Sequence, residues 1–100
     1  MFVGPEANLS GKDLRNINLS SSGLSGINFT HANLTAANLS DTYLINANFT
    51  NANLENADLS SSNLTNTNFT NANLNNTNLN NVIFDNTIMP DGNIRNFGSD

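Results

Sequence analysis

A large apolar residue stands at every fifth position of this chain, without a skip, over 17 units. These central residues are Leu9, Leu14, Leu19, Leu24, Phe29, Leu34, Leu39, Leu44, Phe49, Leu54, Leu59, Leu64, Phe69, Leu74, Leu79, Phe84 and Met89. Two residues before most centres stands a small or β-branched residue, and the other three positions are mostly Asn, Ser, Thr, Asp or Gly. A separation of two places both side chains on one side of an extended chain, while the polar residues suit turns and solvent. Each unit therefore predicts a very short strand followed by a corner.

A longer repeat sets the number of sides. The run N-F-T-x-A-N-L occurs at 28–34, 48–54 and 68–74, three segments spaced by 20 residues. Four units therefore make one coil, and 17 units make about four coils. A helix does not fit, because its inward positions would recur every 3.6 residues. The predicted core columns are Phe29, Phe49 and Phe69 on one side and Leu34, Leu54 and Leu74 on the next.

The recurring A-N-L-x-x or A-D-L-x-x unit carries a resemblance to a known family. It occurs as Ala32-Asn33-Leu34, Ala57-Asp58-Leu59 and Ala72-Asn73-Leu74, among others. This unit resembles the pentapeptide repeat family, over about 85 residues. The resemblance implies an all-β fold, a right-handed quadrilateral parallel β-helix (a solenoid), and the handedness comes from the family alone. The chain then divides into an N-terminal cap over 1–6, the β-helix over 7–91 and a C-terminal cap or tail over 92–100.

Both ends of the repeat are expected to be capped. Phe2 and Val3 are predicted to cover the first coil. The Pro-Asp-Gly sequence at 90–92 is a turn signal, after which Ile94 and Phe97 have the spacing to fold back over the open core. The alternative is that this end pairs with a second copy of the chain, which would make a homodimer through a solenoid end.

Asparagine is unusually abundant, at 24 of 100 residues. A polar, weakly charged, Asn-rich chain can be disordered or prone to aggregation. Disorder requires no apolar residue at every fifth position, whereas a solenoid does. On the phenylalanine side, the stacked Asn8, Asn28, Asn48 and Asn68 are expected to form amide ladders between coils.

The charge and the start of the chain bound its partners and its location. The net charge is −5, and the basic residues are only Lys12, Arg15 and Arg95, which argues against direct nucleic-acid binding. No apolar run approaches the roughly 20 residues of a membrane span. The first residues lack the basic and apolar segments of a secretory signal. We expect a cytoplasmic protein, although a mature exported or lumenal chain would look the same.

The sequence predicts no catalytic residue, metal site or cofactor. There is no cysteine, no phosphate-binding glycine loop and no zinc-ligand spacing. His31 is expected at a solvated corner, away from any nucleophile and carboxylate that would complete a triad. Glu55 and Asp58 fall on adjacent sides, so we expect a solvated pair. The N-x-S/T sequons follow from the repeat itself and, without a secretory signal, are not evidence of glycosylation.

One side of the rod departs from the polar pattern. Its outward positions carry Tyr43, Ile45 and Ile83, where the other sides carry mainly Asn, Ser or Thr. Tyr43 and Ile45 flank Leu44, and Ile83 lies two coils further on. An exposed apolar patch is a candidate contact surface for an as yet unidentified protein partner. The alternative is that these are scattered surface apolar residues without a role.

Three functional hypotheses follow. The first is a non-enzymatic solenoid that serves as a protein-binding or structural module; many members of the family have no known activity, and small ones are frequent in cyanobacteria. The second comes from the resemblance: some members mimic duplex DNA and inhibit or protect DNA gyrase. That mimicry needs acidic stripes, whereas the acids here fall in different columns. The third is binding of ice or ordered water by the outward ladder of Thr30, Thr50 and Thr70.

Overall fold

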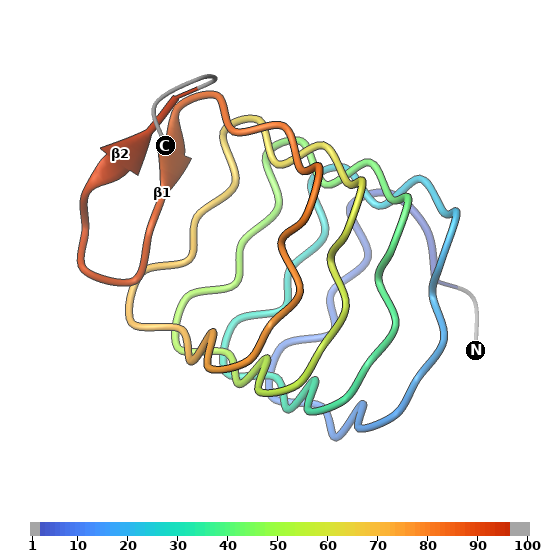
Figure 1. Cartoon of the computed structure of the whole chain (residues 1–100). Helices are drawn as coiled ribbons and strands as arrows, with labels where there is room; N and C mark the ends of the chain where they lie inside the picture. Colours follow the sequence, from blue (N-terminus) through green and yellow to red (C-terminus); the bar gives the residue numbers. More distant parts are fainter. Residues whose placement is uncertain (1–2, 97–100) are drawn as a thin grey trace.

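The computed structural model describes residues 3–96 as a four-sided coil that winds along one axis (Figure 1). Its Cα extents are 36 × 22 × 21 Å. The first described coil lies at one end of the rod, and β1 (Thr87–Ile88) and β2 (Ile94–Arg95) lie at the other. Because equivalent residues of successive coils lie above one another, the architecture is the predicted parallel β-helix.

Backbone pairing confirms the 20-residue coil. All the bridges between coils are parallel and join residues 20 apart, one residue per unit. The four columns of bridged residues are Asn8–Asn28–Asn48–Asn68–Ile88, Asp13–Asn33–Asn53–Asn73, Asn18–Asn38–Asp58–Asn78 and Gly23–Tyr43–Asn63–Ile83. Within one column the N–H of Leu34 donates to the carbonyl of Asn53 at 2.7 Å, and the N–H of Asn53 donates to the carbonyl of Ala32 at 3.0 Å. Each unit is thus held to the next coil through its backbone.

At each corner of the coil, one residue adopts the left-handed backbone conformation. The position two after each centre has positive φ in every unit from Glu6 to Asn86, at values such as 60° for Ala36 and 62° for Asn56. The turn is closed by a bond such as the one from the N–H of Ala37 to the carbonyl of Leu34, at 3.0 Å. Apart from glycine, asparagine is among the residues that adopt this conformation most readily. It fills nine of the 15 non-glycine corners, so the corner geometry accounts for much of the asparagine content.

Replacing Ala36 with asparagine is expected to stabilise the protein. Ala36 is exposed and left-handed, and Asn16, Asn56 and Asn76 occupy the same corner in the other coils. We expect the free energy of unfolding to rise by about 0.5–1 kcal/mol, as measured by urea denaturation. Ala36→Val should have the opposite sign, because a β-branched residue is strained at positive φ. Equal stability of all three chains would contradict this account of the corners.

The centres of the units form the core. Phe29, Phe49 and Phe69 are fully buried and stack one per coil, with ring centroids 5.1 and 4.9 Å apart. Leu34 and Leu54 are likewise buried, whereas Leu74 is half-buried because it belongs to the last complete coil.

Hydroxyl groups at the second inward position link the coils. The side chain of Thr67 donates to the carbonyl of Leu44 at 2.7 Å, and that of Thr87 donates to the carbonyl of Leu64 at 2.6 Å. Within residues 3–96 no buried side-chain nitrogen or oxygen lacks a hydrogen-bond partner. Polar residues can therefore occupy the interior without the cost of an unsatisfied group.

The asparagines before the centres bond within their own coil. The Oδ1 atom of Asn48 accepts both the N–H of Thr50 at 3.0 Å and its hydroxyl at 2.7 Å. Asn68 accepts the same two bonds from Thr70. The predicted amide ladder is wrong for residues 3–96, where no hydrogen bond joins two stacked carboxamides of this column. The physical reason is that each carboxamide satisfies a backbone N–H two residues on, as in an Asx turn.

The C-terminal end differs from the prediction. β1 continues the ladder of one side by pairing with Asn68, and the chain then turns back so that β2 runs antiparallel to β1. Ile94 is 61% exposed, so the prediction that it covers the core is wrong. Pairing with the backbone of β1 keeps this strand at the edge of one side, and Arg95 instead lies 4.4 Å above the ring of Phe84. Phe97 lies outside the described residues.

At the N-terminal end, Val3 packs against the core and Gly4 is buried. The N–H of Glu6 donates to the carbonyl of Ser25 at 2.9 Å, which begins the ladder. Phe2, the other residue predicted to cover the first coil, lies outside the described residues.

Candidate functional site

Two exposed apolar side chains share one side of the rod, which we call the Tyr43 face: the outward residues around the centres Leu24, Leu44, Leu64 and Phe84. Tyr43 is 62% exposed and Ile83 is 43% exposed. They stand in one bridged column with Asn63 between them. Two coil steps put them about 10 Å apart. Ile45 is half-buried on the other flank of Leu44, so it contributes less surface than the sequence pattern predicts.

A hollow of about 350 Å³ opens between these two side chains. Its lining residues are Asp41, Thr42, Tyr43, Ser61, Asn63 and Ile83. We call it the Asn63 hollow, because the short Asn63 lies between the larger Tyr43 and Ile83. The Oδ1 atom of Asn63 accepts the N–H and the hydroxyl of Thr65, at 3.1 and 2.6 Å, which holds this carboxamide along its own coil. The hollow therefore exists because Asn63 is shorter than the residues that precede and follow it in the column.

One acidic residue, Asp41, lines the hollow. Asp41 is exposed at a left-handed corner, with φ at 56°, and its carboxylate makes no hydrogen bond or ion pair with the described residues. Asp85 follows Phe84 on the same face and is also exposed. The outward positions of the face carry no lysine or arginine, and Arg95 lies above the ring of Phe84, the last centre of this face.

One ion pair occurs within residues 3–96, and it lies on a different side. The guanidinium of Arg15 contacts the carboxylate of Asp13 at 2.8 Å. This side-chain hydrogen bond lowers the pKa of Asp13 and raises the pKa of Arg15. With Arg15 engaged in this way, the chain has little free positive charge with which to neutralise Asp41.

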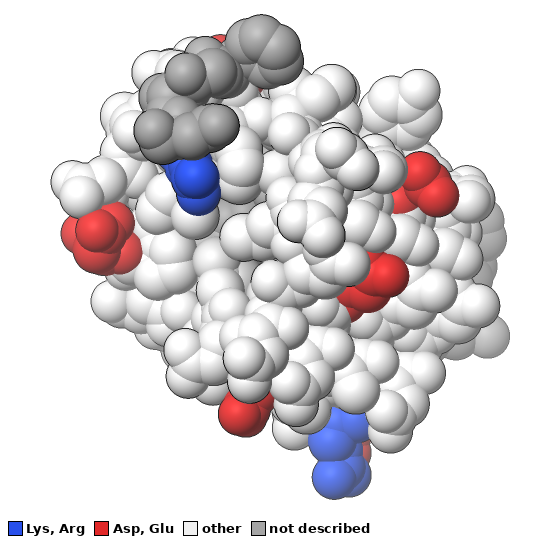
Figure 2. All heavy atoms as spheres, in the orientation of Figure 1, with Lys and Arg blue, Asp and Glu red and all other residues white. Residues whose placement is uncertain are grey.

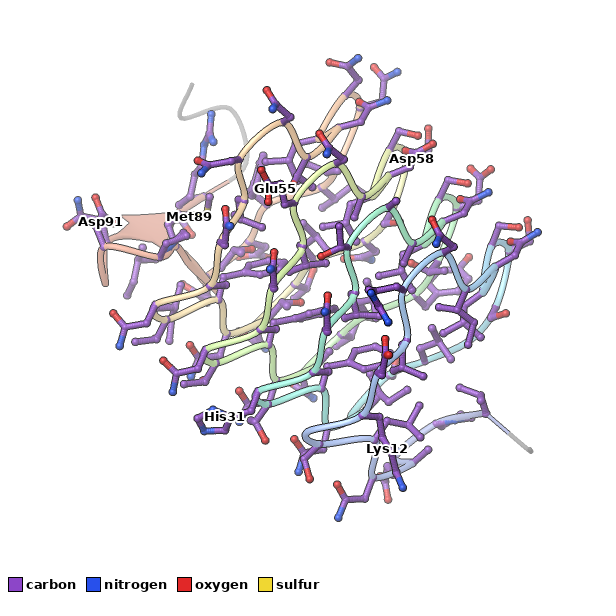
Figure 3. All side chains as sticks on the ribbon, turned by 90° about the horizontal axis from the view of Figure 1, so that it is seen from below. Lys12, His31, Glu55, Asp58, Met89 and Asp91 are labelled. Atoms are coloured by element: carbon purple, nitrogen blue, oxygen red, sulfur yellow. The ribbon has the colours of Figure 1, made fainter. Side chains whose placement is uncertain are left out.

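The residues that could support acid–base chemistry lie apart. His31 points away from the rod at an exposed corner, and Glu55 and Asp58 project from separate places (Figure 3). Within the described residues, no group of three His, Cys, Asp or Glu side chains could hold a metal ion. The structure therefore does not bring His31, Glu55 and Asp58 together in one site.

The acidic side chains do not form stripes. On the face seen in Figure 2 they appear singly, separated by uncharged surface. No two acids of residues 3–96 occupy one column of the coil. Two of the three hydroxyls of the threonine ladder are also engaged, since those of Thr50 and Thr70 donate to Asn48 and Asn68. Neither an acidic DNA-like surface nor a plane of free hydroxyls is therefore favoured by this geometry.

The apolar walls of the hollow, Tyr43 and Ile83, stand out in the sequence pattern, whereas its polar residues do not. The 20-residue column does place Asn63 between Tyr43 and Ile83. The same counting assigns Asp41 and Ser61 to the adjacent corner, where both have positive φ. The 20-residue spacing thus predicts which polar residues are neighbours of Tyr43 and Ile83, whereas the volume of the hollow depends on the size and orientation of their side chains.

Residues 3–96 contain no helix long and apolar enough to cross a membrane.

Comparison with known proteins gives a consistent family assignment. The family model described as pentapeptide repeats, in eight copies, matches residues 6–35, 27–66 and 62–96. No curated protein matches the chain. Three solved structures of pentapeptide repeat proteins are similar to it over most of its length.

The first is HetL, a protein involved in heterocyst differentiation regulation from the cyanobacterium Nostoc, with 28% identity and a TM-score of 0.59 over 93% of this chain and 49% of HetL. The second, from the cyanobacterium Cyanothece, is 36% identical with a TM-score of 0.57, over 85% of this chain and 62% of that one. The third, from the thylakoid lumen of Arabidopsis thaliana, is 26% identical with a TM-score of 0.53, over 87% and 71%. The chain thus spans about half of HetL and 62% of the Cyanothece protein. The fold of these proteins is the right-handed quadrilateral β-helix.

Proposed function

This chain belongs to the pentapeptide repeat family, and from that premise we propose that it is a non-enzymatic protein-binding module whose contact surface is the Tyr43 face. The observation that carries the proposal is the pairing of Tyr43 and Ile83 around the Asn63 hollow. On the other three sides the outward positions are mostly polar, and their asparagines accept backbone N–H groups, as Asn48 does from Thr50 and Asn33 from Thr35. Side chains such as Tyr43, which join a large apolar area to few rotatable bonds, are enriched in protein interfaces.

The scaffold supports a binding role. Each coil is held by backbone bonds on both sides, so outward side chains are presented on a rigid frame. Apolar groups on a rigid surface lose little conformational entropy on association. HetL is described as involved in regulation of differentiation. A regulatory role of that kind depends on recognition of other molecules and needs no catalytic group. The Tyr43 face is a surface suited to such recognition.

A capture experiment tests the proposal. The tagged native chain and a Tyr43→Asn/Ile45→Thr/Ile83→Asn variant are compared as baits in a lysate of the organism that encodes the chain. Each substitution introduces the residue type that Asn63 or Thr65 supplies at the equivalent position, so the variant is expected to fold. We expect a specific protein to be retained by the native chain and lost by the variant, and the purified protein to bind the native chain directly.

The matched control is a Thr35→Asn/Glu55→Asn chain. These two positions lie on the opposite side of the rod, and Asn75 is the equivalent residue of the last complete coil. This control should retain the same partner as the native chain. Equal retention by the native chain and by the Tyr43-face variant, or binding that is lost only in the control, would overturn the assignment of this surface.

A further inference from the structure

We propose that the Asn63 hollow receives an arginine side chain presented by the partner protein. This inference rests on the proposed function, because it specifies the chemistry of the group that docks on the Tyr43 face. It is carried by three features of the hollow: the exposed ring of Tyr43, the unpaired carboxylate of Asp41 and the aliphatic wall of Ile83.

The ring and the carboxylate together select a cation. The Tyr43 ring is largely exposed, and Gly23, which precedes it in the column, has no side chain that could cover it. A cation over an aromatic face is attracted by the ring quadrupole. Asp41 lines the same hollow and has no described partner, so it is available to pair with that cation.

The shape of the hollow favours arginine over lysine. A guanidinium is planar, so it can stack on the Tyr43 ring while its N–H groups point along the plane toward the Asp41 carboxylate. A lysine ammonium is more strongly hydrated and has no flat face. The two walls, Tyr43 and Ile83, stand about 10 Å apart along one column, which leaves room for one side chain. Its head can contact Tyr43 while its aliphatic stem lies toward Ile83.

The charge of the face disfavours two other occupants. A second copy of this chain, packed face to face, would bring Asp41 and Asp85 of each copy together. The cation at the end of this face, Arg95, already lies above the ring of Phe84. Like charges brought together and partly desolvated are repulsive. Nucleic acid would present phosphates to the same carboxylates, in a chain of net charge −5. A basic residue on a protein is the occupant that complements this surface.

Tyrosine fluorescence offers a local test, because Tyr43 is the only tyrosine and there is no tryptophan. The probe is the capped tripeptide acetyl-Ala-Arg-Ala-amide, titrated into the full chain. The comparison peptides replace arginine with citrulline, which keeps the shape and removes the charge, or with lysine. We expect a saturable change with the arginine peptide and about fivefold weaker binding of the citrulline peptide. Added salt should weaken the arginine peptide more than the citrulline peptide.

The variant Asp41→Asn tests the contribution of the Asp41 carboxylate to binding. Asn81 is the equivalent corner residue two coils on, so asparagine suits the left-handed conformation at this position. In this variant the arginine peptide should bind about fivefold more weakly, whereas the citrulline peptide should be unaffected. In amide NMR spectra the arginine peptide should shift Tyr43, Asn63 and Ile83. Equal binding of the arginine and citrulline peptides, no saturable binding, or shifts confined to other sides would overturn the inference.

The two proposals can fail separately. Partner capture that depends on the Tyr43 face, together with no preference for the arginine peptide, would leave the binding module intact and overturn the arginine assignment. Failure of the capture experiment, with the arginine peptide still selected at the hollow, would overturn the protein-binding function and keep the chemistry of the hollow.

Discussion

Replacing Leu54 with aspartate is expected to abolish the cooperative folding of the rod. Leu54 is fully buried in the middle of its column, between Leu34 and Leu74. A carboxylate at this position would be buried among apolar side chains without a partner, at a cost of several kcal/mol in addition to the lost apolar burial. A domain of this size has roughly 5–15 kcal/mol of stability in total. We expect circular dichroism to show loss of the β spectrum and of the cooperative thermal transition.

The matched control is Asn53→Asp, which places the same charge on the neighbouring residue. The side chain of Asn53 points outward, and its Oδ1 atom accepts the N–H of Glu55 at 3.0 Å. Asp58 makes the equivalent bond to Ser60 on the next side, so a carboxylate is compatible with this position. This variant should melt close to the native chain. A Leu54→Asp protein that keeps the native spectrum and melt would show that Leu54 does not point inward.

The coil was predictable because one geometric constraint governs every unit. Apolar residues five apart can share one core only if the chain turns by one side per unit, and the phenylalanine period of 20 then fixes four sides. The observed bridges, such as Asn33 to Asn53, reproduce that count. The handedness did not follow from spacing, since a left-handed coil has the same period, and it was taken from the family resemblance.

The polar details were not predictable in the same way, because several partners compete for each group. Stacked Asn28 and Asn48 can in principle bond to one another or to their own backbone. In the structure the local N–H of Thr30 or Thr50 takes the carboxamide oxygen. The spacing of Ile94 is likewise compatible with two arrangements, one over the open end of the core and one paired with β1. In the structure Ile94 pairs with Ile88 of β1.

In the candidate site, too, the spacing predicts the positions of the residues but not their contacts. Tyr43 and Ile83 break the polar pattern, and a period of 20 assigns them to one column. The space between them depends on the orientation of Asn63, which its two bonds from Thr65 fix. A position in the repeat therefore predicts which residues are neighbours, whereas the volume between those neighbours depends on contacts that only the structure shows.

Phe49→Ala is expected to be the most destabilising of the purely apolar truncations. Phe49 is fully buried, and among residues 3–96 it is the only phenylalanine with ring contacts on both sides, at 5.1 Å to Phe29 and 4.9 Å to Phe69. Truncation of a buried phenylalanine costs about 3–5 kcal/mol through lost burial and the cavity left behind. The loss of two aromatic pairs adds to that cost. Chemical denaturation should place the change in the free energy of unfolding at the upper part of this range.

Relaxation around this site should be small for a reason specific to the solenoid. The coils that carry Phe29 and Phe69 are joined to the coil of Phe49 by backbone hydrogen bonds. One of these bonds runs from the N–H of Phe49 to the carbonyl of Asn68, at 2.7 Å. The coils therefore cannot close on the cavity without breaking the ladder. The control is Phe49→Leu, since leucine is the central residue of the three other sides in this coil, and it should cost about 1–1.5 kcal/mol. Similar losses for the alanine and leucine variants would mean that the coils do collapse, and that the ladder is more compliant than its hydrogen bonds imply.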